Sequence, residues 1–409
     1  MSTTILMLAI PFFLVSIAVE WLWDLRKKTG FVTFNDAFGS LAVGILSRSS
    51  KVILWSAGAF FIHHYWVKVT LWQWPADAWY TWVFTFIAYD FVYYWTHRAG
   101  HSINFFWAGH VVHHQSEEFN LTTALRQTST GLFTWIFALP LLWLGVPVEV
   151  YATCTALNLI YQFWVHTRHI GTLGWFERWF VTPSHHRVHH GQNPEYIDKN
   201  HGGVFIIWDK WFGTFQQEMK DVEPIYGVRR TLANLNPFFA NVHVWWSLFK
   251  DAWYCEKLTD AFKIWWMPTG WRPEDQMINA PIKKSDLQHF RKYDPGATDA
   301  IKTYAGYLLV SSIVMLVHFL LSFENHPQIT KTLLMFFLVS APLLTGAWLL
   351  EGRSIFLELT RIAVSAVSLI FIWQDLTWGL WVWAVHLGLG CFGVFALLFI
   401  RNQRNPQPS

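Results

Sequence analysis

Residues 79–101, with the sequence WYTWVFTFIAYDFVYYWTHRAGH, join an apolar run directly to a pair of histidines. The run from residue 79 to residue 95 approaches the roughly 20 apolar residues that a helix needs to cross a bilayer. His97 and His101 follow it at positions i and i+4, which places both side chains on one face of a continuing helix. The stretch therefore predicts a membrane helix that presents imidazoles at one end.

Apolar runs of similar length recur along the chain. Gly145-Val146-Pro147 separates two of them, and we expect residues 132–144 and 148–165 to form a helical hairpin around that turn. Residues 38–46 are a weaker apolar stretch, for which we favour an interfacial helix over a span. The pattern predicts an all-α, polytopic membrane helical bundle. Its remaining spans are expected at residues 5–23, 52–67, 304–321, 333–350, 355–373 and 378–400.

The composition agrees with a protein that faces lipid. The chain is 53% hydrophobic and only 14% charged, whereas soluble proteins carry about a quarter charged residues. Its 28 Trp fit this setting because Trp is enriched where bilayer meets water. A net charge of +3 without a basic stripe argues against a nucleic-acid partner. Three cysteines without paired spacing form no disulfide framework.

Lys and Arg residues set the expected orientation, because they are enriched in cytoplasmic connections. They follow the spans at residues 5–23 and 79–95 and are frequent between residues 168 and 302. We therefore expect an integral multi-pass membrane protein with a catalytic domain at residues 1–302. In that domain, residues 1–166 hold the spans and residues 167–302 form a cytoplasmic cap. Residues 303–409 are expected to form a C-terminal four-span bundle.

Histidines are the strongest chemical signal in the chain. Of 19 histidines, 12 fall between His97 and His201. The boxes HRAGH at 97–101, HVVHH at 110–114 and HRVHH at 186–190 repeat spacings of three and four, which share a helix face. His166 ends the expected hairpin on the same side of the membrane. The predicted metal ligands are His97, His101, His110, His113, His114, His166, His186, His189 and His190.

These imidazoles predict a histidine-rich di-metal site in the cap. Neutral imidazole is a common metal ligand, since its unprotonated nitrogen has a free lone pair. The nine rings are too many for one ion but supply two ions with four or five ligands each. Imidazole accepts Zn, Cu, Fe and Ni, so the residue types alone leave iron and zinc open. The lipid C–H bonds beside the ligands favour a redox metal, and hence iron.

Three further residues are candidates either for metal ligands or for partners that orient them. Asp90 lies seven residues before His97 on the same helical face and could accept a ligand histidine's second N–H. The alternative for Asp90 is an ion pair with a nearby arginine. Asn158 lies about two turns before His166, and His185 neighbours His186. We expect no catalytic side chain beyond the metal ligands, and the residues leave cofactor-binding positions unknown.

The stretches around the histidines resemble the fatty acid hydroxylase and sterol desaturase superfamily, whose members are integral membrane di-iron oxygenases. Within it, the chain is most similar to the alkylglycerol monooxygenase branch. The likeness is dense from about residue 85 to residue 230 and is limited to the layout in the last spans. The stretches that carry it are YDFVYYWTHR at 89–98, WAGHVVHH at 107–114, FNLTTALRQ at 119–127, YQFWVH at 161–166, TPSHHRVHH at 182–190, IDKN at 197–200 and WDKWFGTF at 208–215.

The resemblance implies two Fe ions held by the nine predicted histidines, with His185 as a further candidate. It also implies insertion of one atom of O2 at a lipid C–H bond, which beside an ether oxygen leads to ether cleavage. Tetrahydrobiopterin is the external reductant that this branch implies. Ser102 stands where animal members carry a Glu thought to serve the pterin. A ferredoxin or cytochrome electron donor is therefore the alternative reductant.

We thus expect an O2-dependent monooxygenase whose partners are a lipid substrate and the bilayer. The alternative within the superfamily is a sterol, carotenoid or fatty acyl hydroxylase or desaturase. The alternative from another class is a histidine-rich metal transporter or sensor. Transport ligands should lie at mid-membrane along a path, whereas these histidines lie at helix ends. We place the active site on the cytoplasmic side and favour a bacterial inner membrane over the endoplasmic reticulum.

Overall fold

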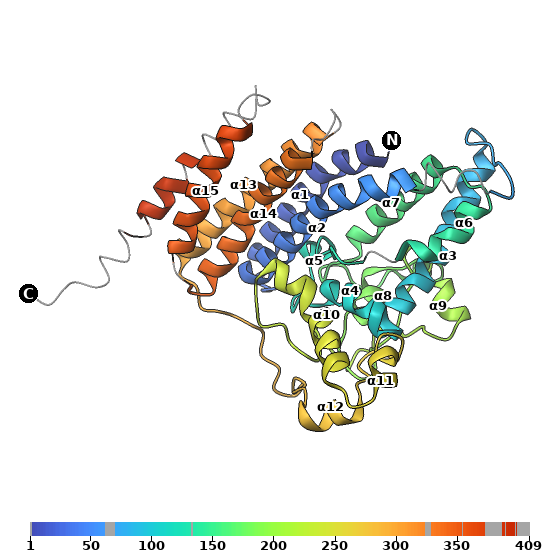
Figure 1. The fold of residues 1–409 in the computed structure, drawn as a ribbon. Helices are drawn as coiled ribbons and strands as arrows, with labels where there is room; N and C mark the ends of the chain where they lie inside the picture. Colours follow the sequence, from blue (N-terminus) through green and yellow to red (C-terminus); the bar gives the residue numbers. More distant parts are fainter. Residues whose placement is uncertain are drawn as a thin grey trace, which may run out of the picture. The chain divides into compact units, whose positions relative to one another are not determined.

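The computed structural model describes residues 2–61, 70–131, 134–323, 329–353, 355–372, 387–388, 390–396 and 398 (Figure 1). These residues form helices and two isolated β-bridges but no strand, which confirms the all-α prediction. The helices are α1 (Ser2–Lys27), α2 (Phe34–Phe61), α3 (Trp79–Ser102), α4 (Asn104–His114), α5 (Leu121–Ala124), η3 (Thr134–Ala138), α6 (Leu139–Trp143), α7 (Val148–Trp164), η4 (Gly174–Arg178), α8 (Pro183–His189), α9 (Ile207–Trp211), α10 (Pro237–Tyr254), α11 (Leu258–Lys263), α12 (Glu274–Asn279), α13 (Asp299–Phe323), α14 (Ile329–Leu350) and α15 (Phe356–Ile372).

The chain divides into two compact units, and each unit is built from three segments that are not contiguous in the sequence. The first unit comprises residues 1–33, 56–232 and 241–292, and it contains every histidine of the predicted boxes. The second comprises residues 34–55, 233–240 and 293–409. Helix α2 is therefore shared, with its first part belonging to the second unit.

In the described part of the chain, two helices are long and apolar enough to cross a membrane by length and composition. They are the segments Asp299–Leu321 and Thr332–Leu350, within α13 and α14. Both coincide with spans expected from the sequence, at residues 304–321 and 333–350. The runs at 5–23, 79–95 and 148–165 lie in the long helices α1, α3 and α7, apart from the last residue of the third run. Most of the expected span at 378–400, and residues 62–67 of another, lie outside the described residues.

Helix α2 differs from the expectation. Residues 38–46 were expected to form a separate interfacial helix, but they continue into the start of the expected span 52–67 as a single helix. Two of the serines between these stretches bond back to carbonyls within the helix. The hydroxyl of Ser49 donates to the carbonyl of Ile45 at 2.9 Å, and that of Ser50 donates to Ser47 at 3.0 Å.

The expected span at residues 132–144 is described from residue 134 onward, since residues 132 and 133 lie outside the described residues. Its described part is a 3-10 turn followed by α6, from Thr134 to Trp143. At about 2.0 Å per residue in the 3-10 turn and 1.5 Å in α6, this segment rises roughly 17 Å, less than the roughly 30 Å hydrocarbon core. Gly145 ends it with a φ of 84°, and a Cβ there would overlap the carbonyl of Trp72. The turn is thus packed against the chain that precedes α3.

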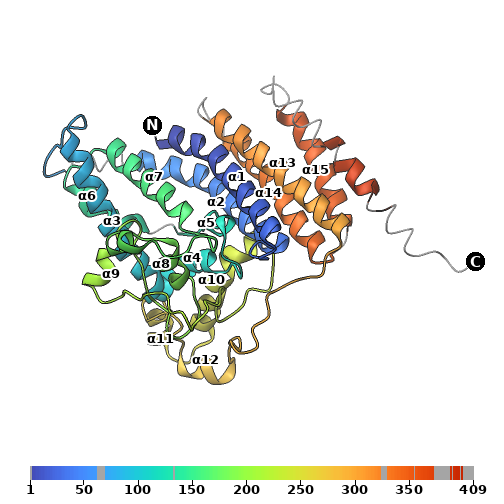
Figure 2. The same cartoon turned by 180° about the vertical axis from the view of Figure 1, so that it is seen from behind.

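Helix α7 packs against both α1 and α3, and α3 carries the first two predicted ligands (Figure 2). The rings of Phe13 and Phe163 lie with centroids 4.3 Å apart. Near the end of α1, the buried carboxylate of Glu20 accepts from the backbone N–H of Leu121 at 2.7 Å. It also accepts from the hydroxyl of Thr167 at 2.6 Å. Glu20 therefore ties α1 to the chain segment next to His166.

We predict that Glu20→Ala destabilises the protein by about 1–3 kcal/mol, because it leaves the N–H of Leu121 and the hydroxyl of Thr167 without their acceptor. Thermal unfolding in detergent, followed by circular dichroism, measures the effect. Glu149→Ala is the matched control, since Glu149 is exposed in the first turn of α7. Equal unfolding temperatures for the two variants would contradict the role given to Glu20.

Candidate metal centre

The predicted histidines all lie at or near the ends of helices in the first unit. His97 and His101 occupy the last turns of α3, and the HVVHH box occupies the end of α4. His166 lies two residues after the end of α7. Pro183 at the start of α8 has the fixed φ that suits a first helical turn, and this short helix carries the last box. The apolar helices thus place polar ligands where each helix stops.

The nine rings lie in two groups whose nitrogen atoms are within 4.8 Å of one another in each group. The five-histidine group is His97, His101, His110, His114 and His189, and the four-histidine group is His113, His166, His186 and His190. The pairs His113-His114 and His189-His190 are each divided between the groups, because successive residues of a helix point about 100° apart. The boxes at 110–114 and 186–190 therefore each serve both groups, whereas the box at 97–101 serves the five-histidine group alone.

A close backbone approach brings α3 and α4 together at the five-histidine group. A Cβ on Gly100 would lie only 3.2 Å from the imidazole of His110. The Nε2 atoms of His101, His110 and His114 are each 3.1 Å from the other two. Two nitrogens bound at right angles to one ion at about 2.1 Å lie about 3.0 Å apart. The triangle therefore fits three adjacent ligands of one metal ion.

The tautomers of the four-histidine group give a second reason to expect a cation. The Nδ1 of His113 lies 3.0 Å from the carbonyl of Arg126, and the Nδ1 of His166 lies 2.8 Å from that of Gln162. A carbonyl oxygen only accepts, so both Nδ1 atoms carry protons. The two Nε2 atoms lie 3.2 Å apart. In neutral rings both are lone-pair acceptors, and a bound cation removes their repulsion.

The rings are held in the neutral form by burial. Loss of hydration lowers the pKa of His97 to about 3 and that of His113 to about 4. It also lowers the pKa values of the other seven rings well below 6.5, with neighbouring histidines adding to the effect. Neutral imidazoles have the lone pair that a metal requires.

Two rings of the five-histidine group also donate their Nδ1–H to a backbone carbonyl, as His113 and His166 do. The Nδ1 of His97 donates to the carbonyl of His201 at 2.8 Å, and that of His189 donates to Lys199 at 2.9 Å. The Nε2 atoms of both rings are buried and have no hydrogen-bond partner within the described residues. Buried polar atoms are rarely left unpaired, so these atoms fit metal ligands.

Asp90 and Asn158 lie together but outside both groups. The side-chain amide of Asn158 donates to Asp90 at 2.7 Å. Within the described residues, the other donors to Asp90 are the indole of Trp208 and two backbone N–H groups rather than a histidine. The prediction that Asp90 accepts a hydrogen bond from a ligand histidine is therefore wrong: its donors are other residues. Asp90 instead accepts from the backbone N–H groups of Val204 and Phe205.

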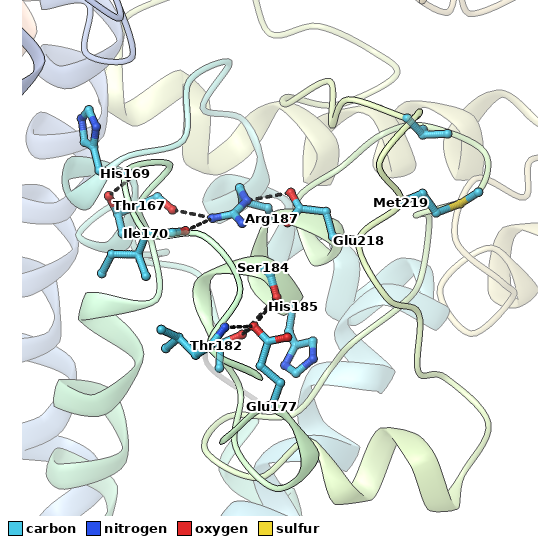
Figure 3. Close-up of polar contacts among 12 residues, drawn as sticks. Thr167, His169, Ile170, Glu177, Thr182, Ser184, His185, Arg187, Glu218 and Met219 are labelled. Atoms are coloured by element: carbon cyan, nitrogen blue, oxygen red, sulfur yellow. Dashed lines mark hydrogen bonds and ion pairs between the residues drawn. The ribbon is translucent and has the colours of Figure 1, made fainter. Parts of the chain in front are cut away.

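His185 also lies outside the two groups. Figure 3 shows its ring beside Glu177, whose carboxylate accepts from Thr182 at 2.9 Å and from Ser184 at 2.8 Å. Burial lowers the pKa of His185 to about 4, although Glu177 opposes this shift. Its buried Nδ1 has no partner within the described residues. The structure thus separates His185 from its neighbour His186.

Arg187 fixes α8 against the segment that carries His166. Its guanidinium makes a two-pronged ion pair with Glu218, with both distances 2.7 Å. It also donates to the carbonyls of Thr167 and Ile170 at 3.1 and 2.7 Å (Figure 3). The sequence marked Arg187 only as part of a histidine box, because its partners lie about 20 and 30 residues away in the chain.

The comparisons with known proteins agree with this site. The fatty acid hydroxylase family model matches residues 82–214, which include all nine histidines. Alkylglycerol monooxygenase of Xenopus tropicalis is 35% identical over 311 residues, covering 75% of this chain and 67% of that protein. The Homo sapiens enzyme of that name is 40% identical over 268 residues, covering 65% and 59%. No solved structure is significantly similar to the chain.

The chain therefore belongs to the fatty acid hydroxylase family, and its resemblance to the alkylglycerol monooxygenases is confirmed. It spans about three fifths of the length of the human relative. An ornithine lipid hydroxylase of Rhizobium tropici is a more distant relative, 26% identical over 226 residues, which cover 51% of this chain and 64% of that protein.

We predict that Fe(II) raises the unfolding temperature of metal-free protein and that a chelator reverses the rise. An ion that binds the folded chain alone, at 100 times its Kd, adds about 2.7 kcal/mol of stability. Anaerobic thermal unfolding measures this effect. His113→Ala should reduce the shift, since it removes one of the opposed nitrogens. An unfolding temperature that does not change when Fe(II) is added would contradict the inference that the opposed Nε2 atoms bind a cation.

Proposed function

We propose that the chain is a membrane di-iron monooxygenase that hydroxylates a lipid C–H bond with O2. The observation that carries this proposal is the pair of buried histidine groups with opposed acceptor nitrogens. The ligands would be the nine predicted histidines, divided five and four between the two ions. The names of the relatives, which are monooxygenases and a hydroxylase, support an oxidoreductase over a metal transporter.

The size of the five-histidine group favours iron over zinc. Zinc sites in proteins are almost always four-coordinate, with three or four protein ligands. Five imidazoles exceed that number and suit an ion of higher coordination. When bound, iron would supply the oxidising chemistry that activates O2 toward a C–H bond.

The chain's own residues would perform three tasks in the reaction. Backbone carbonyls that accept from Nδ1 would aim each Nε2 at the metal. Burial would keep the rings neutral and keep water away from them. Arg187 would hold the last box against the segment of His166 through its bonds to the carbonyls of Thr167 and Ile170.

The lipid would reach this site from the bilayer. Helices α1, α3 and α7 carry exposed apolar side chains, such as Leu22, Phe84 and Leu157, which suit contact with lipid. We propose that residues 1–302 form the catalytic domain and residues 303–409 a membrane bundle. The active site would lie on the cytoplasmic side, and we favour a bacterial inner membrane.

The relatives point to two lipid classes. The alkylglycerol monooxygenases favour an alkylglycerol, whose hydroxylation beside the ether oxygen leads to ether cleavage. The ornithine lipid hydroxylase favours hydroxylation of a polar lipid without cleavage as the second candidate. The external reductant would be tetrahydrobiopterin or, given Ser102, a ferredoxin or cytochrome.

We predict that purified protein contains two iron ions per chain and consumes O2 with an alkylglycerol and a reductant. His114→Ala and His189→Ala should each lower the iron content and reduce activity by at least 100-fold, because each removes a ligand of the five-histidine group. Iron quantification and O2 uptake, with reduced pterin or reduced ferredoxin, are the measurements. Product analysis separates the ether lipid from an ornithine lipid.

His289→Ala is the matched control, because His289 is an exposed histidine that pairs with Asp286 outside both groups. It should retain full activity and iron. Normal activity in the His114 and His189 variants would overturn the ligand assignment. Zinc without O2 uptake in the wild-type protein would overturn the proposed function.

A further inference from the structure

We propose that Asp90 and Asp209 are positioning residues for the five-histidine group, acting through the backbone of residues 198–205. This inference rests on the proposed function, since it assumes that the group holds a metal ion. It adds residues that touch neither the metal nor the substrate. It also assigns them to one of the two ions rather than to the site as a whole.

The loop at residues 198–205 supplies the acceptors for three rings of the five-histidine group. Its Lys199 and His201 carbonyls accept from His189 and His97 at 2.9 and 2.8 Å. The carboxylate of Asp198 lies 3.3 Å from the Nδ1 of His101. The position of this loop therefore sets the direction in which these Nε2 atoms point.

The two rings of the other group whose orienting bonds are known use different acceptors. His113 donates to the carbonyl of Arg126, and His166 donates to that of Gln162. Neither acceptor belongs to residues 198–205. A displaced loop should therefore disturb the orienting bonds of the five-histidine group, whereas those of His113 and His166 do not depend on it.

Asp209 holds the first half of the loop. Its carboxylate accepts from the backbone N–H of His201 at 2.7 Å and from that of Gly202 at 2.8 Å. The hydroxyl of Thr214 donates to the same carboxylate at 2.7 Å. Asp209 is fully buried, so these donors have no water to replace it. The carbonyl that orients His97 belongs to a residue whose N–H is bound by Asp209.

Asp90 holds the second half of the loop. Its carboxylate accepts from the backbone N–H groups of Val204 and Phe205 at 2.8 and 3.0 Å. The indole of Trp208 and the amide of Asn158 donate to it at 2.9 and 2.7 Å. The two carboxylates thus accept from backbone N–H groups that would bond to carbonyls in a regular helix or strand. A carboxylate suits this role because it only accepts and offers two oxygens.

Local packing leaves the loop little room. Asn200 has a φ of 56°, and its side chain donates to the carbonyls of His185 and Gln216 at 3.0 and 2.7 Å. A Cβ on Gly203 would lie 2.8 Å from a carboxylate oxygen of Asp90. A Cβ on Gly202 would lie 2.6 Å from the carbonyl of Phe205. The loop is therefore fitted to the two carboxylates at close range.

The test is the iron content of full-length protein carrying Asp209→Asn or Asp90→Asn. An amide of the same shape turns one acceptor into a donor that faces a backbone N–H. We expect iron to fall from two ions per chain to about one, with the X-ray absorption spectrum of the remaining ion unchanged. Activity should fall at least tenfold, because one ion is lost.

Two milder variants keep the test informative if the asparagine variants do not fold. Thr214→Val removes one donor to Asp209 and should speed release of one ion to a chelator about tenfold. Thr214→Ser restores the hydroxyl and should restore the wild-type release rate. Equal release rates for the two Thr214 variants would overturn the proposal.

Asp251→Asn is the matched control. Asp251 is also a buried carboxylate of the first unit, but it pairs with Arg272, away from residues 198–205. This variant should keep both ions. Retention of both ions in the Asp90 and Asp209 variants, loss of both ions, or equal loss in Asp251→Asn would overturn the inference. Wild-type protein that binds no iron would instead overturn the proposed function.

Discussion

The close approach of neutral imidazole acceptors is the constraint on which the rest of the structure depends. His113 and His166 direct their Nε2 atoms at each other across 3.2 Å, with both protons committed to carbonyls on the far side of the rings. Such a pair is repulsive without a cation. The fold tolerates it because helices fix the ends from which the rings project, and because burial keeps the rings unprotonated.

Backbone carbonyls do most of the work of orienting these rings. Four rings donate Nδ1–H to main-chain oxygens, at Gln162, Arg126, Lys199 and His201. Each carbonyl in turn depends on the segment that holds it, whether the last turn of α7 or a loop bound to buried carboxylates. The ligand geometry is therefore a property of the backbone, and the side chains that secure that backbone lie one layer away.

Sequence periodicity predicts the features that are written in the order of side chains, namely the ligand histidines and the long apolar helices. The repeated spacings of three and four placed the nine histidines, which the structure brings into two groups. The apolar runs placed α1, α3, α7, α13 and α14. Carbonyl acceptors carry no signature in a sequence, so the roles of Lys199 and His201 could not be found. The sequence marks Asp90 as unusual, but its partners lie 68 to 118 residues away and follow no local spacing.

The order of the ligands along the chain has a consequence for biosynthesis. The last ligand of the four-histidine group is residue 190 of the chain. The five-histidine group also has its last ligand by then, but its orienting carbonyls and their carboxylate anchor extend to residue 209. The box that completes the four-histidine group is held in turn by Arg187, whose carboxylate partner is Glu218. Both groups therefore take their ligands from residues made before the carboxylates that hold them in place, and neither pocket is secured until the chain beyond residue 209 has been made.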